Sequence, residues 1–472
     1  MSDASVAGLK RELGLFDSTM IVAGSMIGSG IFIVSADIAR TVGGAGWLLV
    51  VWLITGVITV IAALSFGELA GMMPHAGGQY VYLREAYGPL AGFLYGWTLF
   101  LVIQTGTIAA VAVAFAKFTG VLLPWFSEQH LLFAAGRFHV SAAQLLAIAV
   151  IALLTTLNLR GLKLGKLVQN FFTVAKIASL AGLALLVFYA LRQGSAWAAN
   201  FQAAWQASWQ RLQAGALAAT EPLSGLKIWA AIGVAMVGSL FSSVAWENIT
   251  YTAGEVRRPE RDVALSLALG TALVSLLYIL ANVTYLAVLP MDAIQAAPRD
   301  RVATAALSAL FGAPGSAFMA ALIMVSTFGC NNGLILSGAR VYYAMAKDGL
   351  FFDRIGTLNR ASVPGAALVL QGLWAGLLCL SGAYGDLLDY VVVATLLFYG
   401  MTVAGIFVLR VKRPDAPRPT KAWGYPVVPA FYIAACAAIS LDLLIYKPAY
   451  TWPGLVIVLL GIPVYFLRRR RA

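Results

Sequence analysis

Two short stretches of this sequence interrupt apolar runs with small and polar residues. The first is Gly24–Gly30 (GSMIGSG), and the second is Phe241–Asn248 (FSSVAWEN). Glycine and serine weaken a helix, so each stretch predicts a local opening of helical backbone. N–H groups freed after an opening suit a carboxylate, and carbonyls freed before an opening suit an ammonium group. A site that has both would recognise the backbone of an α-amino acid.

The contacts expected at these openings can be assigned to individual groups. We expect the N–H groups around Ser29 and Gly30 to hold the carboxylate. An alternative is that small residues only let membrane helices pack closely, as small-xxx-small motifs do. The matching positions of the two stretches favour the binding site. The carbonyls expected to hold the ammonium group are those of Met26, Ile27, Phe241 and Val244.

The composition indicates which elements carry these stretches. Of the 472 residues, 61% are hydrophobic and only 11% are charged. A soluble domain carries about 25% charged residues, so most of this surface must face lipid. A bilayer-spanning helix needs about 20 apolar residues, and the chain has about twelve such runs. We therefore expect an all-α membrane protein with about twelve transmembrane helices. The runs cover residues 16–40, 46–73, 89–123, 141–158, 167–191, 226–252, 263–289, 313–345, 364–383, 386–411, 426–446 and 450–467.

The basic residues predict the orientation of these helices. Of the 32 lysines and arginines, 22 fall in segments on the side of the N-terminus and eight on the other side. By the positive-inside rule both termini are then cytoplasmic. The net charge of +12 and the Arg468–Arg471 run thus indicate membrane topology, with the run near anionic headgroups. We expect the lipid bilayer as a partner and no nucleic acid.

The two interrupted runs are the first and the sixth, five helices apart. Interrupted helices at corresponding places in two halves are typical of the binding site of a secondary transporter. This spacing predicts a five-plus-five inverted repeat followed by two additional helices. The expected division is a cytoplasmic tail (1–15), two five-helix repeats (16–191 and 226–411), two further helices (426–467) and a basic tail (468–472).

Two charged residues fall near the middle of the membrane. Lys176 lies about 15 Å along the fifth run, where an unpaired ammonium group is costly and therefore a functional candidate. Glu247 adjoins the second opening. It would set substrate charge, titrate as a gate or only bond exposed backbone, and these alternatives stay open. Its neighbour Trp246 is either a ligand contact or packing.

Nothing in the sequence indicates an enzyme. The three cysteines and three histidines are scattered, so they form no metal motif or CxxC pair. No HExxH or GxxxxGK[ST] motif is present, which argues against a membrane-embedded metalloenzyme and an ATP-driven pump. We expect no metal and no cofactor.

The sequence resembles the amino acid–polyamine–organocation superfamily, and within it the L-amino-acid transporter group. Four segments carry the resemblance: Gly24–Phe32 (GSMIGSGIF), Gly77–Gly88 (GGQYVYLREAYG), the GEVRRPERDVALSL segment around Glu255, and the segment from Asn332 to Arg340. The resemblance implies a LeuT-type fold that works by alternating access. It also implies that the aromatic Phe241 closes over bound substrate from the outside.

The resemblance also implies roles for individual residues. The substrate carboxylate is expected near Ser25, Gly28, Ser29 and Gly30. Lys176 is expected to bridge the first helix to the eighth, where sodium-coupled relatives bind cations. The expected partners on the eighth helix are Ser326 and Thr327, with Cys330 where relatives often have serine.

Two departures from the family pattern bear on the substrate. The sixth helix has Ser242, Ser243 and Val244 where relatives often have glycines, and branched Val244 would narrow the side-chain pocket. Glu247 stands where many exchangers of neutral amino acids have asparagine. It matches a glutamate of the arginine/agmatine antiporter branch. We expect an exchanger of small neutral L-amino acids; the alternatives are a proton-coupled symporter and a transporter of cationic amino acids or polyamines.

The resemblance also bears on partners and location. Human members of the group join a heavy chain through an external disulfide, but residues 124–140 contain no cysteine here. We therefore expect no disulfide-linked heavy chain, a monomer, and a place in a bacterial inner membrane.

Overall fold

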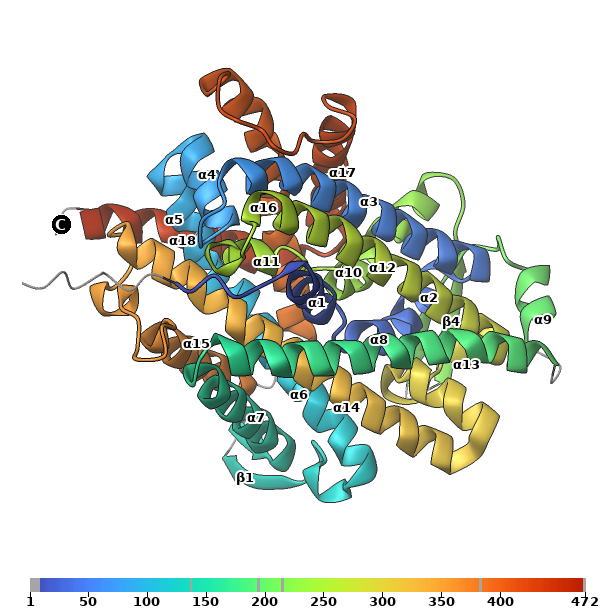
Figure 1. Cartoon of the computed structure of the whole chain (residues 1–472). Helices are drawn as coiled ribbons and strands as arrows, with labels where there is room; N and C mark the ends of the chain where they lie inside the picture. Colours follow the sequence, from blue (N-terminus) through green and yellow to red (C-terminus); the bar gives the residue numbers. More distant parts are fainter. Residues whose placement is uncertain (1–8, 136–137, 193–195, 214–215, 382–383, 470–472) are drawn as a thin grey trace, which may run out of the picture.

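The computed structural model describes residues 9–135, 138–192, 196–213, 216–381 and 384–469 of the chain. These residues form a bundle of helices that run in alternating directions (Figure 1). Within the described residues, nine helices are long and apolar enough to cross a membrane. They are α3 (Ala45–Met72), α5 to α6 (Pro89–Leu122, continuous through Leu99–Ile103), α7 (Ala142–Leu159), α8 (Leu162–Arg192), α12 (Pro259–Val288), α14 (Val302–Lys347), α16 (Tyr384–Lys412), α17 (Val427–Tyr446) and α18 (Pro448–Arg469).

Three further predicted spans contain shorter apolar helices. The first span is α1 (Leu15–Met26) followed by α2 (Ser35–Val42), and the sixth is α10 (Leu226–Ser242) followed by α11 (Asn248–Tyr251). Both fall below the usual length because they are interrupted where the glycine, serine and polar residues lie. The ninth is α15 (Gly365–Cys379). The predicted class, an all-α multi-pass membrane protein, is confirmed.

Connections between the spans carry structure that the sequence did not indicate. A hairpin of β1 (Leu131–Ala135) and β2 (Phe138–Ser141) precedes α7. A second hairpin, β3 (Ser208–Gln213) and β4 (Ala216–Pro222), precedes α10. The remaining short helices are α4 (Gln79–Tyr87), α9 (Trp197–Gln202) and α13 (Met291–Gln295).

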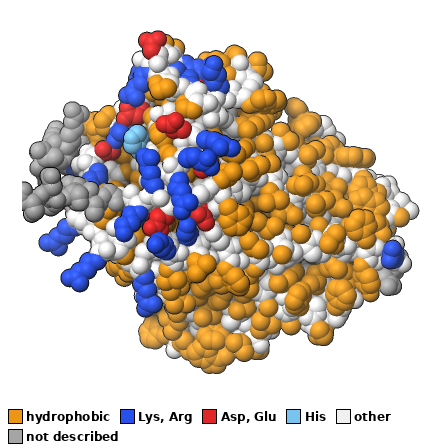
Figure 2. All heavy atoms as spheres, in the orientation of Figure 1, with side chains coloured by type: hydrophobic (Ala, Val, Ile, Leu, Met, Phe, Trp, Pro, Cys, Tyr) orange, Lys and Arg blue, Asp and Glu red, His pale blue; other side chains and the backbone are white. Residues whose placement is uncertain are grey.

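The surface is divided as a membrane protein requires. Figure 2 shows a broad hydrophobic surface beside one end of the molecule where lysine and arginine side chains gather. The outward face of α8 illustrates the hydrophobic part, since Phe171, Leu185 and Phe188 are each about two-thirds exposed. Soluble monomers rarely expose a contiguous apolar surface of this extent, because water would drive it into an interface.

The basic end is held together by ion pairs between loops. Arg84 of α4 pairs with Asp348 at the end of α14 and with Glu85, and Arg413 after α16 also pairs with Glu85. Burial alone would raise the pKa of Glu85, but the hydrogen bonds from Arg84 and Arg413 outweigh it and hold that pKa below its usual value. The cluster therefore stays ionised at neutral pH.

A fully buried ion pair joins the segment after the sixth span to the eighth span. The Arg340 side chain donates from Nε and Nη2 to both Glu255 oxygens, at 3.0 and 2.9 Å, and both side chains are 1% exposed. The sequence singled out both residues as members of family segments but did not indicate that they pair. Their sequence separation explains this, because only the packing of α14 against the segment after α11 brings them together.

We expect Arg340→Met to destabilise the protein by about 3–5 kcal/mol, because it leaves the Glu255 carboxylate buried without its partner. The measurement is thermal unfolding in detergent. Changing both residues to methionine should recover most of the loss, because no uncompensated charge remains. Lys227→Ala is the control, since its pair with Glu221 is exposed and such pairs contribute little. Equal losses in Arg340→Met and the double variant would show that the charge is not the cause.

Candidate substrate site

The first opening separates α1 from the rest of its span. The helix ends at Met26, and the chain resumes as a short 3-10 turn over Gly30–Phe32 before α2. The opening thus lies inside the predicted Gly24–Gly30 stretch. Within the described residues, the N–H groups of Gly30 and Ile31 donate to no acceptor. These two donors point to the anion site that the sequence predicted at this place.

The second opening lies between α10 and α11. The helix ends at Ser242, and Ser243–Glu247 connects it to α11. Ala245 has a φ of 69°, in the left-handed region that favours glycine. This strained residue allows the sharp turn that exposes backbone here. Within the described part of the chain, the carbonyls of Phe241 and Val244 accept no hydrogen bond.

The two openings pack directly against each other. A Cβ built on Gly30 would lie 2.1 Å from the Oγ of Ser242 and 3.0 Å from its Cα. Glycine is therefore required at residue 30, because no side chain fits between the two backbones. This close approach unites groups that are more than 200 residues apart in the sequence.

Tyr278 of α12 ties the two openings together. Its hydroxyl lies 3.0 Å from the carbonyl oxygens of both Met26 and Ser242, so it donates to the end of α1 and to the end of α10. The sequence analysis missed this residue. The one signal was a tyrosine in the middle of an apolar span, and only the packing of α12 gives it a partner.

Lys176 is completely buried, and its ammonium group lies against the end of α1. Its Nζ donates to the carbonyls of Gly24 at 2.7 Å and Ile27 at 2.9 Å. Among the described residues, no carboxylate lies within ion-pair distance of it. Carbonyls at the C-terminal end of a helix carry partial negative charge, so they stabilise this cation in place of a counter-ion.

The eighth span also contacts carbonyls of the first opening. The Ser326 hydroxyl lies 3.2 Å from the Ile27 oxygen and 3.1 Å from the Gly28 oxygen, and the Cys330 thiol donates to the Ser25 carbonyl at 3.0 Å. Lys176 and Ser326 therefore share the Ile27 oxygen. Thr327 is not brought to the opening, because its hydroxyl donates to carbonyls of its own helix.

A cluster of polar side chains contacts α1 at Met20, before the opening in the chain. Asn332 of α14 donates to the Gln169 side chain and to the Gly165 carbonyl of α8, both at 3.0 Å. Gln169 in turn donates to the Met20 carbonyl at 3.3 Å. The sequence analysis noted Asn332 as part of a family segment but missed Gln169. This cluster fixes α1 against the two helices that carry Lys176 and Ser326.

Glu247 is 3% exposed and lies among tyrosine hydroxyls. It accepts hydrogen bonds from Tyr399 of α16 and, at 3.2 Å, from Tyr251. The Tyr251 hydroxyl lies 2.5 Å from that of Tyr95 on α5. The carboxylate thus links three spans. Within the described residues it has no lysine or arginine partner.

Two further predicted residues, Val244 and Trp246, line a small cavity. Val244, Trp246, Thr395 and Tyr399 line a space of about 20 Å³ between α10 and α16, which is room for a single water. Trp246 is 1% exposed and packs edge-on against Phe66, so packing accounts for it in this conformation. This cavity is too small for an amino acid, so a substrate there needs the helices that line it to separate.

The first opening contains one further unsatisfied group. The Ser25 hydroxyl is buried and has no hydrogen-bond partner among the described residues. Met26 and Ile27, by contrast, have carbonyls that already accept from Tyr278, Lys176 and Ser326. A buried polar atom without a partner is rare and calls for a ligand or water. The groups left for a substrate are therefore the Ser25 hydroxyl, two N–H groups and the carbonyls of Phe241 and Val244.

We expect Tyr278→Phe to lower stability by about 1–3 kcal/mol and to slow transport, because two buried carbonyls lose their shared donor. Thermal unfolding and uptake into proteoliposomes would measure both effects. Tyr285→Phe on the same helix is the matched control, since its hydroxyl makes one longer contact, 3.3 Å to the Ile31 carbonyl. If the two variants behaved alike, the bridge between the openings would have no special role.

The chain was also compared with known proteins by sequence. The chain matches the amino acid permease family over residues 13–464. It is 28% identical to the b(0,+)-type amino acid transporter 1 of Mus musculus, over 99% of this chain and 89% of that protein. It is 31% identical to the large neutral amino acids transporter small subunit 2 of Homo sapiens, over 97% of this chain and 80% of that protein. The matched region contains both openings and Lys176.

Proposed function

The chain belongs to the amino acid permease family, and from this premise we propose that it exchanges small neutral L-amino acids across a membrane by alternating access. It is an amino acid transporter, not an enzyme. The observation that carries the proposal is the pair of openings that meet at Gly30 and Ser242. We also propose the five-plus-five inverted repeat over residues 16–191 and 226–411, which the breaks in the first and sixth spans support.

The substrate carboxylate binds at the first opening in this proposal. Its donors are the N–H groups of Gly30 and Ile31, which have no acceptor within the described residues, and the Ser25 hydroxyl, which has no partner there, is a further candidate. Oriented backbone N–H groups at a helix start bind carboxylates without needing a charged side chain. This leaves the buried lysine free for another role.

The ammonium group binds at the second opening. Of the four carbonyls expected from the sequence, those of Met26 and Ile27 already accept hydrogen bonds, whereas those of Phe241 and Val244 accept none within the described residues. We therefore assign the ammonium group to Phe241 and Val244. The substrate then joins the two openings, and Phe241 closes over it from the outside.

The substrate side chain extends toward Val244 and Trp246. The cavity beside them is about 20 Å³ in this conformation, and the branched side chain of Val244 limits its growth. One additional methylene in an apolar pocket changes affinity by about 1–3 kcal/mol. This supports alanine, serine or a similarly small neutral amino acid over an aromatic one.

Alternating access requires the two openings to move together. Tyr278 holds the ends of α1 and α10, and Lys176 and Ser326 hold the same end of α1 against α8 and α14. Substrate binding can shift the equilibrium between two conformations only if the substrate binds one of them more tightly than the other. We propose that Lys176 couples the movement of the first and sixth spans to the eighth, with Ser326 as its partner.

A second candidate function is proton-coupled uptake or transport of a cationic amino acid or polyamine. The observation in its favour is Glu247, a buried carboxylate that accepts hydrogen bonds from tyrosine hydroxyls and backbone N–H groups and has no lysine or arginine partner within the described residues. A buried carboxylate without a cationic partner is costly, so it would either take up a proton or attract a cationic substrate. Glu247→Gln tests this, because it keeps the hydrogen bonding and removes the charge.

Uptake into proteoliposomes separates these functions. The purified protein would be offered labelled alanine, serine, leucine, phenylalanine and arginine, with vesicles preloaded or empty and with or without a pH gradient. Uptake of small neutral amino acids only into preloaded vesicles supports exchange. Uptake into empty vesicles that follows an inward proton gradient, and that Glu247→Gln abolishes, supports the symporter instead. Transport of arginine alone contradicts the neutral substrate class.

We propose that the protein works as a monomer in a bacterial inner membrane with both termini cytoplasmic. All three cysteines of the chain are buried, which supports the absence of a disulfide-linked heavy chain.

The burial of the native cysteines also permits a test of the topology with introduced cysteines. A membrane-impermeant maleimide should label Gln129→Cys in intact cells and Asp415→Cys only after permeabilisation, since both positions are exposed and lie in opposite connections. The reverse labelling pattern would contradict the cytoplasmic location of both termini. Photobleaching of single labelled molecules in two steps would contradict the monomer.

A further inference from the structure

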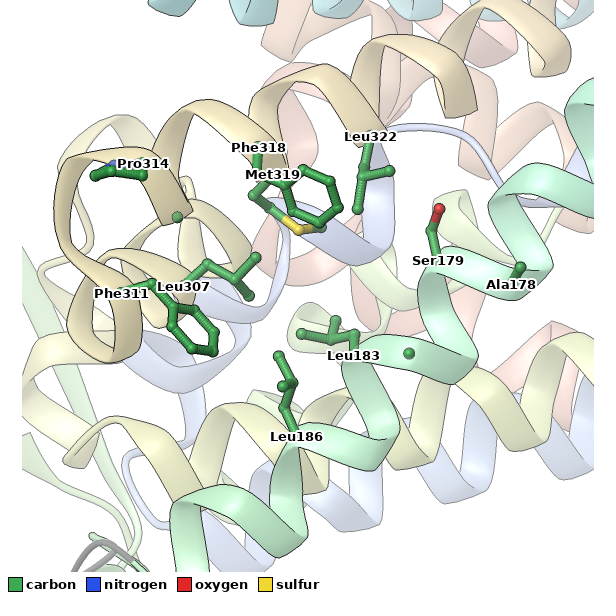
Figure 3. A pocket seen from close by; sticks show the side chains of 12 residues that line it. Ala178, Ser179, Leu183, Leu186, Leu307, Phe311, Pro314, Phe318, Met319 and Leu322 are labelled. Carbon is green, nitrogen blue, oxygen red and sulfur yellow. The ribbon is translucent and has the colours of Figure 1, made fainter.

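A large apolar groove lies between α8 and the first part of α14. It has a volume of about 650 Å³ and is lined by one face of residues 178–186 of α8 and by residues within 307–322 of α14. Figure 3 shows leucine side chains of α8 and leucine, phenylalanine and methionine side chains of α14 around the space between the two helices. The groove lies outside the candidate substrate site, and the transport proposal makes no use of it.

The groove exists because the two helices touch at one depth and diverge at another. They are in close contact where Lys176 passes Gly329, since a Cβ built on Gly329 would lie 3.3 Å from the Cε of Lys176. Farther along, α14 contains a kink at Gly312, with φ 68° and ψ −153°, followed by Pro314. The kink lies beside the groove, and residues on both sides of it line the space.

Aromatic contacts bridge the groove at both ends. Phe172 and Phe328 pack with ring centroids 4.8 Å apart on the side of Lys176, and Tyr189 stacks on Phe311 at 5.8 Å on the other side. Between these bridges the floor is made by Leu183 and other buried residues. The side toward the bilayer is marked by exposed aromatic rings, with Phe311 46% and Phe318 61% exposed.

The position of the groove identifies what fills it. Residues 178–186 span about 12 Å of helix at 1.5 Å per residue, close to the roughly 15 Å depth of hydrocarbon in one leaflet. An apolar space of this kind does not hold water, and an empty one would forfeit the dispersion contacts of its walls. Ring contacts bound the space at both ends, so its short length suits a flexible chain better than a second membrane helix.

We propose that this groove is a lipid site, occupied by one acyl chain of a bilayer phospholipid. The chain comes from the leaflet nearest Leu186 and Leu307, which is the outer leaflet in the orientation proposed above. It packs against both helices that hold the first opening, because the groove begins two residues after Lys176 and ends four residues before Ser326.

Gly182 provides a way to fill the groove with the protein itself. It lines the groove, and a Cβ built there would meet no atom within 4 Å. Gly182→Phe should therefore occupy the space without distorting the helices, and α8 gains helix propensity on losing a glycine. Leu185→Phe is the matched control, since Leu185 is 64% exposed on the same helix and lies outside the lining.

The test uses vesicles of phosphatidylethanolamine containing a small fraction of the same lipid with a diazirine on its acyl chain. After irradiation, peptide mass mapping locates the labelled residues. We expect labelling of residues 178–186 and 307–322 to exceed that of the exposed face of α17 several-fold. Gly182→Phe should reduce it several-fold, and Leu185→Phe should leave it unchanged.

Labelling spread evenly over the hydrophobic surface, or unchanged in Gly182→Phe, would overturn the lipid site. Cross-links to a second copy of the chain at these residues would overturn it as well, in favour of a protein interface. The labelling needs no transport. A failure of the lipid site is therefore distinguishable from a failure of the proposed amino acid exchange, which uptake measures separately.

Discussion

Gly30→Ala is expected to weaken amino acid binding on the order of a hundredfold. The added methyl group would lie 2.8 Å from the Cβ of Ser242 and 3.0 Å from its Cα, so the two openings must move apart. A displacement of about 1 Å in a binding site is enough for an effect of this size. The measurement is binding of labelled alanine or serine to the purified protein, by scintillation proximity.

Two further variants show whether the loss is local. Gly376→Ala on α15 is the matched control, since its added methyl group meets only the Ile148 side chain at 3.9 Å, and it should bind normally. Adding Ser242→Gly to Gly30→Ala removes the clashing Oγ and Cβ and should restore part of the affinity. Normal binding by Gly30→Ala, or by the bulkier Gly30→Val, would mean that the carboxylate site lies elsewhere.

Lys176→Ala is expected to reduce transport on the order of a hundredfold while thermal stability is kept. The variant loses two charge-assisted hydrogen bonds to the Gly24 and Ile27 carbonyls. Such bonds contribute about 1.5–3 kcal/mol each, and about 1.4 kcal/mol corresponds to a factor of ten. Global stability does not fall in parallel, because the variant also removes a buried ammonium group whose desolvation is unfavourable.

The measurements for Lys176→Ala are uptake over a range of pH and thermal unfolding in detergent. Lys117→Ala is the control, because this lysine lies near the end of its span and pairs with Glu128 at a partly exposed site. Its uptake should stay close to that of the unmodified protein. Transport by Lys176→Ala at the normal rate and with the normal pH dependence would refute the coupling role.

The sequence by itself determined the fold class and the location of both openings. Apolar runs of about 20 residues identify spans without any tertiary information, because a bilayer requires every span to satisfy its backbone internally. Clusters of glycine, serine and polar residues within two of these runs located the breaks, because such residues weaken a helix and the clusters lie at matching positions. Lys176 was also identifiable, because a charge at that depth is rare in any membrane helix.

Only the tertiary structure decided how these pieces meet. Gly30 faces Ser242, Tyr278 reaches the ends of both α1 and α10, and Arg340 pairs with Glu255. Each contact joins residues from different spans, so it depends on the rotation of each helix about its axis. Apolar periodicity hardly specifies that rotation in a membrane, where lipid and protein interior are equally apolar.

Helix rotation also decides which predicted site residues contact the first opening and which do not. Ser326 and Thr327 are neighbours in the sequence, about 100° apart around α14, and only Ser326 reaches the carbonyls of the first opening. Residue type could not distinguish them, since both carry a hydroxyl. The packing of α14 against α1 made the choice.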